Sequence, residues 1–576
     1  MAYNPENPLI VQGDKTVLLE VDNPLYEQAR DVLARFAELE KSPEYVHTYR
    51  VTPLSLWNAA AAGMSAEAII QGLSDHSKYP LPDNVRVDIL DFISRYGRVK
   101  LIREDSQLLL VSDDVPLIAE LVRHKRLLPY ILAQRDPCTL VVNPARRGHI
   151  KQALTLIGYP AADLAGYVTG ALLQFSLRRM TKDNETFSLR RYQQEAVDIF
   201  HAGGAAHGGS GVVVLPCGAG KTMVGMGVME KLQCNTLILS PHTVAVRQWI
   251  AELLDKTSLT EEMIGEYSGL RKEVRPVTIT TYQIMTYRPR RKRGSLPPEQ
   301  EFPHFALFDK RDWGLIIYDE VHLLPAPVFR ITAEIQARRR LGLTATLVRE
   351  DGRETDVFSL IGPKKYDVPW KDLEKHGWIA AADCCEIRVS MSDEDRLTYA
   401  VAERRSKYRI AAENPRKLVI LDQLLAKHKG DNVLIMGMYL DQLRVIAERY
   451  DGTPIITGKT SIREREKLFD QFRRGELKTL IVSKVANFAL DLPDANVAVQ
   501  VSGTFGSRQE EAQRLGRILR PKEKGQLAHF YSVVSRDTRD QEFAANRQLF
   551  LTEQGYRYLI LYEDEVEEYE PGVSCT

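Results

Sequence analysis

Short, almost continuously apolar runs alternate with helical segments along the chain from about residue 187 onward. The first set comprises GVVVLP, NTLILSP, VTITTY and GLIIYDE. Runs of this length are typical of strands covered on both faces, and helical segments between them indicate a parallel sheet with crossover connections. A second set, NVLIMGM, TPIITG, KTLIVSK and VAVQVSG, begins near residue 432. The pattern therefore predicts an α/β protein with two successive parallel-sheet lobes of a nucleotide-binding type.

The first 180 residues have a different pattern, with short strands and helices and no catalytic motif. KTVLLEVD (residues 15–22) alternates like a strand, and residues 23–40 have apolar positions at helical spacing, with Asn23 as the expected cap and Pro24 in the first turn. Residues 98–114 are expected to form a hairpin, and residues 145–159 a helix. This part of the chain predicts one or two small α/β docking modules.

Two further segments stand out by their charge. Residues 392–417, between the two sets of apolar runs, are charged and predicted to be mostly helical. The chain ends in YEDEVEEYEPGVSCT, whose acidic run is expected to be a solvated tail.

Composition narrows the class of protein without assigning a function. The 576 residues contain 77 Lys and Arg and 77 Asp and Glu, so any nucleic-acid surface must come from local segregation of charge. Six cysteines without a CxxC pair do not suggest a disulfide framework or a zinc site. No signal segment or membrane-spanning run is evident. We therefore expect a cytoplasmic protein without a membrane partner.

The segment VVVLPCGAGKT (residues 212–222) predicts a phosphate-binding loop. Gly218, Ala219 and Gly220 would let backbone N–H groups close around phosphate, Lys221 would reach the β and γ phosphates, and the Thr222 hydroxyl would hold Mg²⁺. The strict motif has a glycine where this chain has Leu215. Taken alone, the segment is equally compatible with a glycine turn before a helix.

A pair of carboxylates in LIIYDEVHLLP favours the nucleotide interpretation. Asp319 and Glu320 follow an apolar strand, where Asp319 suits the Mg²⁺ shell and Glu320 suits the base that activates water. An isolated Asp-Glu pair is more often a solvated strand end, but downstream of GAGKT it predicts an ATPase. An isolated histidine would more often be incidental, but His322 is a candidate site residue because it belongs to the same Asp-Glu-Val-His motif.

Two later motifs complete the prediction. Thr344 and Thr346 flank Ala345 and are expected to link the Mg²⁺ site to the neighbouring lobe, although a polar strand end is the simpler interpretation. Gln513, Arg517 and Arg520 would share one helix face, as either a γ-phosphate sensor from the second lobe or an ordinary amphipathic surface helix.

These motifs identify a superfamily 2 helicase or translocase motor. LPCGAGKT, DEVHLLPAPVFR, LGLTATLVRED, SKVANFALDLPDA and QRLGRILRP closely resemble the XPB family of DNA repair helicases, and the N-terminal sequence resembles the corresponding module of its bacterial members. In this family Leu-Pro-Cys precedes the glycines, so Leu215 is a family feature.

The resemblance implies RecA-like lobes and a domain order. We expect an N-terminal module in residues 1–95, a second small module and candidate DNA- or damage-recognition region in 96–180, lobe one in 185–362 and lobe two in 363–576. A thumb-like insert that grips DNA is expected near residues 393–414.

The resemblance also implies individual roles. Gln193 would read adenine, and residues 240–253 and 278–283 would track a DNA strand. The residues implied to couple ATP to DNA are Asp491, Arg349, Glu350 and Asp351, the last three matching a motif implicated in duplex separation. ATP and Mg²⁺ are the implied cofactors, the direction is 3′ to 5′, and the setting is DNA repair, with a nuclease or repair protein as a partner.

Basic residues supply candidate contacts to DNA phosphates. The densest stretch contains Arg288, Arg290, Arg291, Lys292 and Arg293, which equally suit a solvated loop. Arg338, Arg339 and Arg340 are a second, weaker candidate. Two alternatives to strand separation stay open: a double-strand translocase, and an ATP-gated DNA clamp that recruits a partner.

Overall fold

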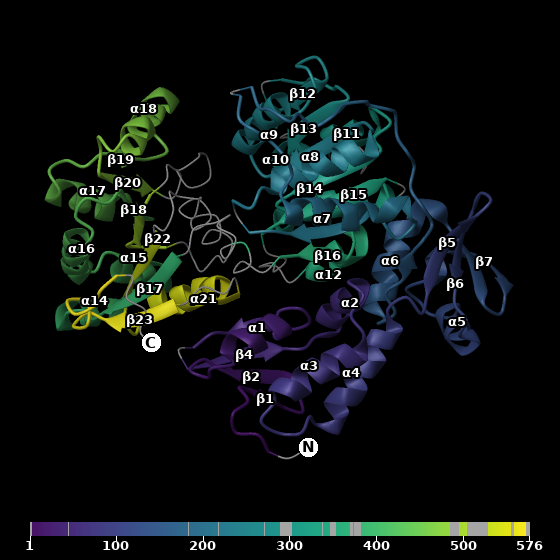
Figure 1. Cartoon of the computed structure of the whole chain (residues 1–576), viewed down its shortest axis with the longest axis horizontal. Helices are drawn as coiled ribbons and strands as arrows, with labels where there is room; N and C mark the ends of the chain where they lie inside the picture. Colours follow the sequence, from purple (N-terminus) through teal and green to yellow (C-terminus); the bar gives the residue numbers. More distant parts are fainter. Residues whose placement is uncertain are drawn as a thin grey trace.

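The computed structural model contains two larger α/β lobes, called lobe one and lobe two, and two smaller modules (Figure 1). The structure describes residues 3–43, 45–182, 184–216, 218–269, 271–288, 302–336, 338–345, 353–368, 373, 382–483, 495–503, 528–553 and 558–571.

Lobe one is built on a seven-stranded parallel sheet with the order β12-β13-β11-β14-β15-β10-β16. Its strands are β10 (Ser210–Val214), β11 (Thr236–Ser240), β12 (Ile264–Tyr267), β13 (Val277–Thr281), β14 (Leu315–Asp319), β15 (Arg339–Thr344) and β16 (Lys364–Asp367). Its main helices are α7 (Arg191–His201), α8 (Lys221–Leu232), α9 (Thr243–Lys256), α10 (Tyr282–Met285) and α11 (Ala326–Glu334).

Both faces of this sheet are covered, which explains the continuous apolar runs. Val213 packs in the core cluster that includes residues of α7, α8 and α9, whereas Val212 and Val214 pack in the cluster that includes residues of α10 and α11. Because alternate side chains of a strand point to opposite faces, a sheet buried on both sides needs apolar residues at every position.

Lobe two repeats the arrangement with a second seven-stranded parallel sheet, in the order β19-β20-β18-β21-β22-β17-β23. Its strands are β17 (Ala382–Val389), β18 (Val433–Gly437), β19 (Ile455–Ile456), β20 (Thr479–Ser483), β21 (Val497–Gln500), β22 (Ala528–Ser535) and β23 (Tyr558–Tyr562). Its helices include α14 (Asp393–Val401), α15 (Arg404–Ala412), α16 (Arg416–Lys427), α17 (Leu440–Arg449), α18 (Ile462–Arg473) and α21 (Arg539–Glu553). Two parallel-sheet lobes in tandem confirm the predicted fold class.

The N-terminal module is a four-stranded antiparallel sheet with four helices. It contains β1 (Leu9–Val11), β2 (Thr16–Glu20), β3 (Glu38–Lys41), β4 (Val46–Arg50), α1 (Tyr26–Leu33), α2 (Pro53–Ala61), α3 (Ala66–His76) and α4 (Asp83–Arg95). It contacts lobe one, where the backbone N–H of Lys364 donates to Oδ1 of Asn58 at 2.9 Å. Its apolar core also includes Leu549 of α21, so it touches lobe two as well.

The second module has the sheet order β7-β8-β6-β5-β9. It contains β5 (Lys100–Glu104), β6 (Gln107–Val111), β7 (Ile131–Asp136), β8 (Thr139–Val142), β9 (Ala162–Asp163), α5 (Val115–Leu121) and α6 (Arg147–Leu156). Helix α6 packs closely on α11, because a Cβ added to Gly148 would lie 2.5 Å from the carbonyl oxygen of Ala333. The expected hairpin over residues 98–114 is confirmed by the antiparallel pairing of β5 and β6.

Helix α1 is shorter than the expected helix over residues 23–40. The backbone N–H groups of Leu25 and Tyr26 bond to Asn23, which forms a turn, and the helix begins at Tyr26 and ends at Leu33. Residues 38–41 form strand β3, where Leu39 pairs with Tyr49 and is buried. Helical spacing of apolar residues did not distinguish this strand because tertiary pairing overrides a local pattern.

The end of the chain also differs from expectation. The acidic run is not simply a solvated tail, since Tyr562 belongs to β23 and Val566 is fully buried in the core of lobe two. The carbonyl of Glu567 accepts a hydrogen bond from Lys427 at 2.9 Å. Strand β16 pairs with β10 in lobe one, although the expected boundary placed residues 364–367 in lobe two.

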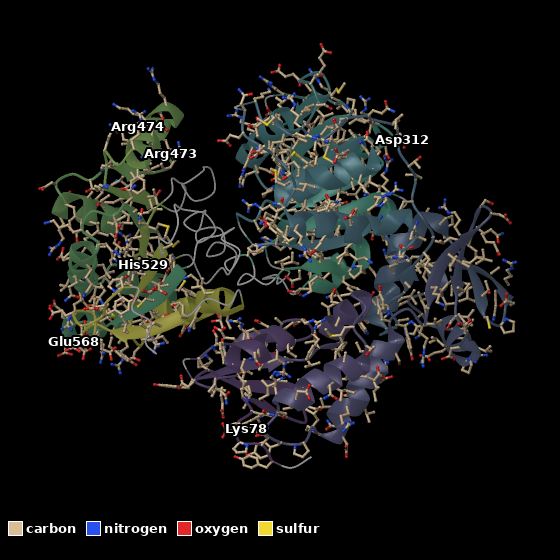
Figure 2. All side chains as sticks on the ribbon, viewed as in Figure 1. Lys78, Asp312, Arg473, Arg474, His529 and Glu568 are labelled. Atoms are coloured by element: carbon tan, nitrogen blue, oxygen red, sulfur yellow. The ribbon has the colours of Figure 1, made fainter. Side chains whose placement is uncertain are left out.

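Several smaller observations bear on the remaining expectations. The four described cysteines, Cys138, Cys234, Cys384 and Cys385, are free. Among the described helices, none has the length and apolarity needed to cross a bilayer. Figure 2 shows side chains projecting from every unit, with Lys78 marking the N-terminal module, Asp312 lobe one and Arg473 the end of α18 in lobe two.

Candidate active site

Three adjacent strands bring the predicted nucleotide residues together. Strand β15 lies between β14 and β10, and all three are parallel. Their carboxyl ends therefore meet at one edge of the sheet, which is where open α/β sheets bind ligands. The loop from β10 to α8, the carboxylates after β14 and Thr344 at the end of β15 share this edge.

The loop before α8 has the backbone that its glycines predict. Gly218 and Gly220 have φ values of 82° and 80°, a region that L side chains rarely adopt. Helix α8 begins at Lys221, so its unpaired N–H groups face the loop. Leu215 is fully buried, and its N–H donates to the Thr344 carbonyl at 2.9 Å. At this position the chain therefore uses an apolar core residue, not a glycine.

Gln193 and its neighbour hold the loop from the side of α7. The Gln193 amide donates from Nε2 to the carbonyl of Ala219 at 2.9 Å, and its Oε1 accepts from the N–H of Arg190 at 2.9 Å. Tyr192, which sequence reasoning did not select, donates its hydroxyl to the same Ala219 carbonyl at 2.6 Å. Both side chains are buried. Gln193, which was expected to read adenine, therefore lies against the predicted phosphate-binding loop.

Lys221 and Glu320 form the central ion pair of the site. Nζ of Lys221 lies 3.0 Å from Oε1 of Glu320, and the two side chains are 12% and 13% exposed. Burial raises the pKa of Glu320, but the charge of Lys221, followed by that of His322, outweighs burial and lowers it. Glu320 also adopts a left-handed backbone, with φ of 49°. A glutamate held ionised beside the loop has the charge state that a general base needs.

Asp319 has a different electrostatic environment. Burial, and then the negative charge of Glu320, raise its carboxyl pKa above the ordinary value. Oδ2 of Asp319 accepts a hydrogen bond from the indole N–H of Trp249 at 3.0 Å, and its main-chain carbonyl accepts from the Tyr282 hydroxyl at 2.8 Å. Two adjacent buried carboxylates favour a cation between or beside them.

These oxygens suit Mg²⁺. Oε2 of Glu320 is buried without a hydrogen-bond partner among the described residues, and Asp319 and Thr222 supply a carboxylate and a hydroxyl. The described residues contain no cluster of three or more His, Cys, Asp or Glu metal ligands. Mg²⁺ in nucleotide sites commonly uses one or two protein oxygens together with substrate phosphates, so the donor set fits an ion that arrives with ATP.

His322 connects the carboxylates to the Thr-Ala-Thr element. Its Nδ1 lies 2.6 Å from Oγ1 of Thr344 and 3.5 Å from Oε2 of Glu320, and its side chain is 3% exposed. The ends of β14 and β15 are therefore joined through side chains at the site.

Of the predicted site residues, Gln193, Gly218, Ala219, Gly220, Lys221, Thr222, Asp319, Glu320, His322 and Thr344 all lie in lobe one around this edge. The predicted residues outside the described ranges are Thr346, Arg349, Glu350, Asp351, Asp491, Gln513, Arg517, Arg520, Arg290, Arg291, Lys292 and Arg293.

The structure corrects one member of the second group of candidate DNA contacts, Arg340. Arg340 is fully buried and donates to the carbonyls of Leu360 and Gln336, each at 2.8 Å. It therefore has a structural role, and its assignment to DNA phosphates was wrong. Arg288, from the denser stretch, is described and lies over the ring of Phe302 at 4.5 Å.

Sequence reasoning missed Trp249 and Tyr282 as neighbours of Asp319. Both lie in or beside the segments expected to track a DNA strand. The available signal was a tryptophan among the apolar positions of an amphipathic helix, because a buried indole N–H requires an acceptor.

Three family models match the chain. The ERCC3/RAD25/XPB C-terminal helicase model matches residues 373–574, a model described as type III restriction enzyme, res subunit, matches residues 186–349, and a helicase conserved C-terminal domain model matches residues 9–136. The last region contains an antiparallel sheet and helices in this structure, and the parallel sheets lie elsewhere.

Full-length relatives give the same family. The chain is 57% identical over 562 residues to a Mycobacterium tuberculosis protein named DNA 3′-5′ helicase XPB, covering 97% of this chain and 99% of the relative. It is 55% identical to a protein of the same name from Kineococcus radiotolerans, covering 98% of each. It is 32% identical to the general transcription and DNA repair factor IIH helicase/translocase subunit XPB of Enterocytozoon bieneusi, covering 97% of this chain and 93% of that protein. The chain therefore belongs to the XPB family of helicases.

Proposed function

We infer that this chain is an ATP-dependent DNA helicase of the XPB type that moves 3′ to 5′ along a strand and acts in DNA repair. The observation that carries this function is the convergence of Lys221, Asp319 and Glu320 at adjacent strand ends, in a chain 57% identical over almost its whole length to a protein named DNA 3′-5′ helicase. A motor needs a lobe that contains the hydrolytic site and a second lobe that responds to hydrolysis. The chain has two parallel-sheet lobes that can take these two parts.

Each residue of the site has a proposed role. Lys221 and the loop N–H groups bind the β and γ phosphates, and Thr222 and Asp319 hold the Mg²⁺ that arrives with ATP. Mg²⁺ neutralises phosphate charge when it is bound. Gln193, which already touches the loop, contacts the adenine side of the nucleotide.

The ion pair between Lys221 and Glu320 suggests how ATP prepares the base. Nζ of Lys221 forms an ion pair with Oε1 of Glu320. Phosphate oxygens compete for the same ammonium group, so ATP draws Lys221 away and leaves the Glu320 carboxylate to accept a proton from water. In this proposal, the binding of phosphate separates the base from its lysine.

Lobe two completes the cycle in this proposal. Gln513, Arg517 and Arg520 approach the γ-phosphate when the lobes close, and an arginine there stabilises the charge of phosphoryl transfer. His322 and Thr344 transmit the state of the phosphate site toward the junction of the lobes, with Thr346, Asp491, Arg349, Glu350 and Asp351 as further coupling residues. Basic residues 288–293 and the insert of α14 and α15 hold DNA.

The partner and location are the finer parts of the proposal. DNA is the substrate, and a nuclease or another repair protein is the proposed macromolecular partner, because a eukaryotic relative is named as a subunit of a repair factor. The cysteine content suggests a reducing, cytoplasmic setting.

The test compares duplexes with a 3′ tail and a 5′ tail in the presence of ATP. We expect DNA to stimulate ATP hydrolysis and only the 3′-tailed duplex to be separated. Displacement of a triplex strand without duplex separation would indicate a double-strand translocase. If ATP keeps the protein on DNA but neither a duplex strand nor a triplex strand is displaced, the protein is a clamp.

A further inference from the structure

The indole of Trp249 contacts the carboxylate proposed to hold Mg²⁺. Its N–H donates to Oδ2 of Asp319 at 3.0 Å, and the Trp249 side chain is almost fully buried, at 1% exposure. Hydrogen bonds to an ionised carboxylate are shorter and stronger than neutral ones. With Oδ2 engaged, the torsion of the Asp319 carboxylate is fixed, and its other oxygen is left for the metal.

The packing around the ring is specific. A Cβ added to Gly225 of α8 would lie 2.5 Å from Cη2 of Trp249 and 3.5 Å from Cδ1 of Ile317 on β14. Glycine at this position therefore leaves room for the indole between the helix that begins at Lys221 and the strand that ends at Asp319. The ring thus touches the element behind the phosphate loop while it bonds to the carboxylate.

Trp249 also belongs to a different functional segment. Trp249 lies in the part of helix α9 that overlaps residues 240–253, the segment expected to track a DNA strand. The other such segment, residues 278–283, supplies Tyr282, whose hydroxyl bonds to the Asp319 carbonyl at 2.8 Å. Both proposed strand-tracking segments therefore bond to one residue, one at its carboxylate and the other at its backbone.

We propose that Trp249 is a positioning residue that holds Asp319 for Mg²⁺ and relays the engagement of a DNA strand by α9 to the metal site. This inference rests on the proposed function, because it takes Asp319 as the Mg²⁺ ligand. A displacement of α9 on DNA moves the indole, and the carboxylate follows through the hydrogen bond. Partners of this kind orient metal ligands, and their loss commonly weakens metal binding.

The test uses Trp249→Phe, which keeps an aromatic ring and removes the N–H. Trp313→Phe is the matched control, because Trp313 is fully buried in lobe one and its indole donates to the Leu307 carbonyl at 2.9 Å, away from Asp319. The readout is the affinity for a fluorescent N-methylanthraniloyl derivative of the imido analogue of ATP. It is measured with Mg²⁺ and with EDTA, each with and without single-stranded DNA.

In Trp249→Phe we expect the ratio of the affinity with Mg²⁺ to that with EDTA to fall about tenfold, within the range found when a partner of a metal ligand is removed. Affinity in EDTA should match the parent, since the substitution removes the hydrogen bond to Asp319 and keeps an aromatic ring in place. DNA should raise the ratio in the parent and in Trp313→Phe, and not in Trp249→Phe. An unchanged ratio in Trp249→Phe would overturn the proposal, and so would an equal fall in Trp313→Phe.

Together with the hydrolysis and strand-separation assays of the parent, these affinities separate this inference from the proposed function. If the parent shows no DNA-stimulated hydrolysis while Trp249→Phe still loses the Mg²⁺-dependent affinity, the motor assignment fails and the positioning role stands. If the parent separates strands while Trp249→Phe keeps its full Mg²⁺ response, only the positioning role fails.

A second measurement covers the outcome in which Trp249→Phe does not fold. The chain has five tryptophans, so protein labelled with 5-fluorotryptophan gives five ¹⁹F resonances, and Trp249 is identified by substituting the other four in turn. We expect its resonance to shift when Mg²⁺ is added to the complex with the imido analogue. A Trp249 resonance whose chemical shift does not change when Mg²⁺ is added would overturn the proposal.

Discussion

Nζ of Lys221 lies 3.0 Å from Oε1 of Glu320 across the edge of the lobe one sheet. The lysine begins α8, and the glutamate follows β14. The loop proposed to bind phosphate and the carboxylate proposed to activate water are therefore in direct contact. Because of this ion pair, replacing either residue changes the charge environment of the other.

Lys221→Ala should abolish ATP hydrolysis and leave DNA binding largely intact. The substitution removes the cation for the β and γ phosphates, while the proposed DNA contacts lie in other segments. A coupled ATPase assay and fluorescence anisotropy with labelled DNA measure the two properties. Turnover near that of the parent would contradict the assignment of the loop.

Thr344→Val should reduce the number of base pairs separated for each ATP hydrolysed. The change removes the hydroxyl that lies 2.6 Å from Nδ1 of His322 and keeps the side-chain volume. We expect about a fivefold loss of coupling, which corresponds to the ~1 kcal/mol net value of one hydrogen bond. Both rates are measured on one 3′-tailed duplex.

Thr332→Val is the control for this prediction. Thr332 is also buried in lobe one, but its hydroxyl bonds to Tyr318 and to the Val328 carbonyl. Neither partner is one of the proposed nucleotide-site residues. Equal losses of coupling in the two variants would assign the effect of Thr344→Val to general packing.

Asp163→Asn should destabilise the junction between the second module and lobe one. Asp163 bonds to Arg147 at 2.6 Å and to Lys151 at 3.1 Å, with all three side chains at least nine-tenths buried. Removing one member of a buried charge cluster costs about 3–5 kcal/mol, because it leaves buried charge uncompensated. Urea unfolding, followed by tryptophan fluorescence, measures the change in the free energy of unfolding. The control is Glu104→Gln, which also replaces a carboxylate by an amide but in the exposed Glu104–Arg135 pair. A loss no larger than that of Glu104→Gln would contradict the prediction.

The same cluster predicts how stability depends on pH. Burial raises the pKa of Asp163, but the charges of Lys151 and Arg147 outweigh it and hold the pKa well below the ordinary value. A carboxyl with a lowered folded-state pKa contributes stability that is present above its unfolded pKa, about 4, and is lost as pH falls through the folded value. The unfolding free energy of the parent should therefore fall more steeply below about pH 4 than that of Asp163→Asn. Parallel slopes in acid would contradict this assignment.

The sequence predicted well that Lys221, Asp319 and Glu320 lie together, because its signals are local. A parallel strand buried on both faces must be continuously apolar, so β14 could be placed, and Asp319 and Glu320 follow it directly. The glycines at 218 and 220 have positive φ, which their residue type predicted. Site residues that directly follow a buried parallel strand can therefore be predicted from the sequence.

Other features depend on contacts between distant segments. Arg340 looked like an exposed cation, but the carbonyls of Gln336 and Leu360 hold it inside lobe one. Leu39 fitted a helix until its pairing with Tyr49 placed it in a strand. The bond from Trp249 to Asp319 joins residues 70 positions apart, and no local pattern encodes it.

The central claim is that ATP hydrolysis at Glu320 drives strand separation. The most direct measurement follows hydrolysis and strand separation together on one 3′-tailed duplex, for the parent and for Glu320→Gln. We expect the parent to do both, and Glu320→Gln to bind ATP and remain on DNA longer while doing neither, because the water loses its base and Asp319 is kept. Strand separation by Glu320→Gln at the rate of the parent would contradict the account.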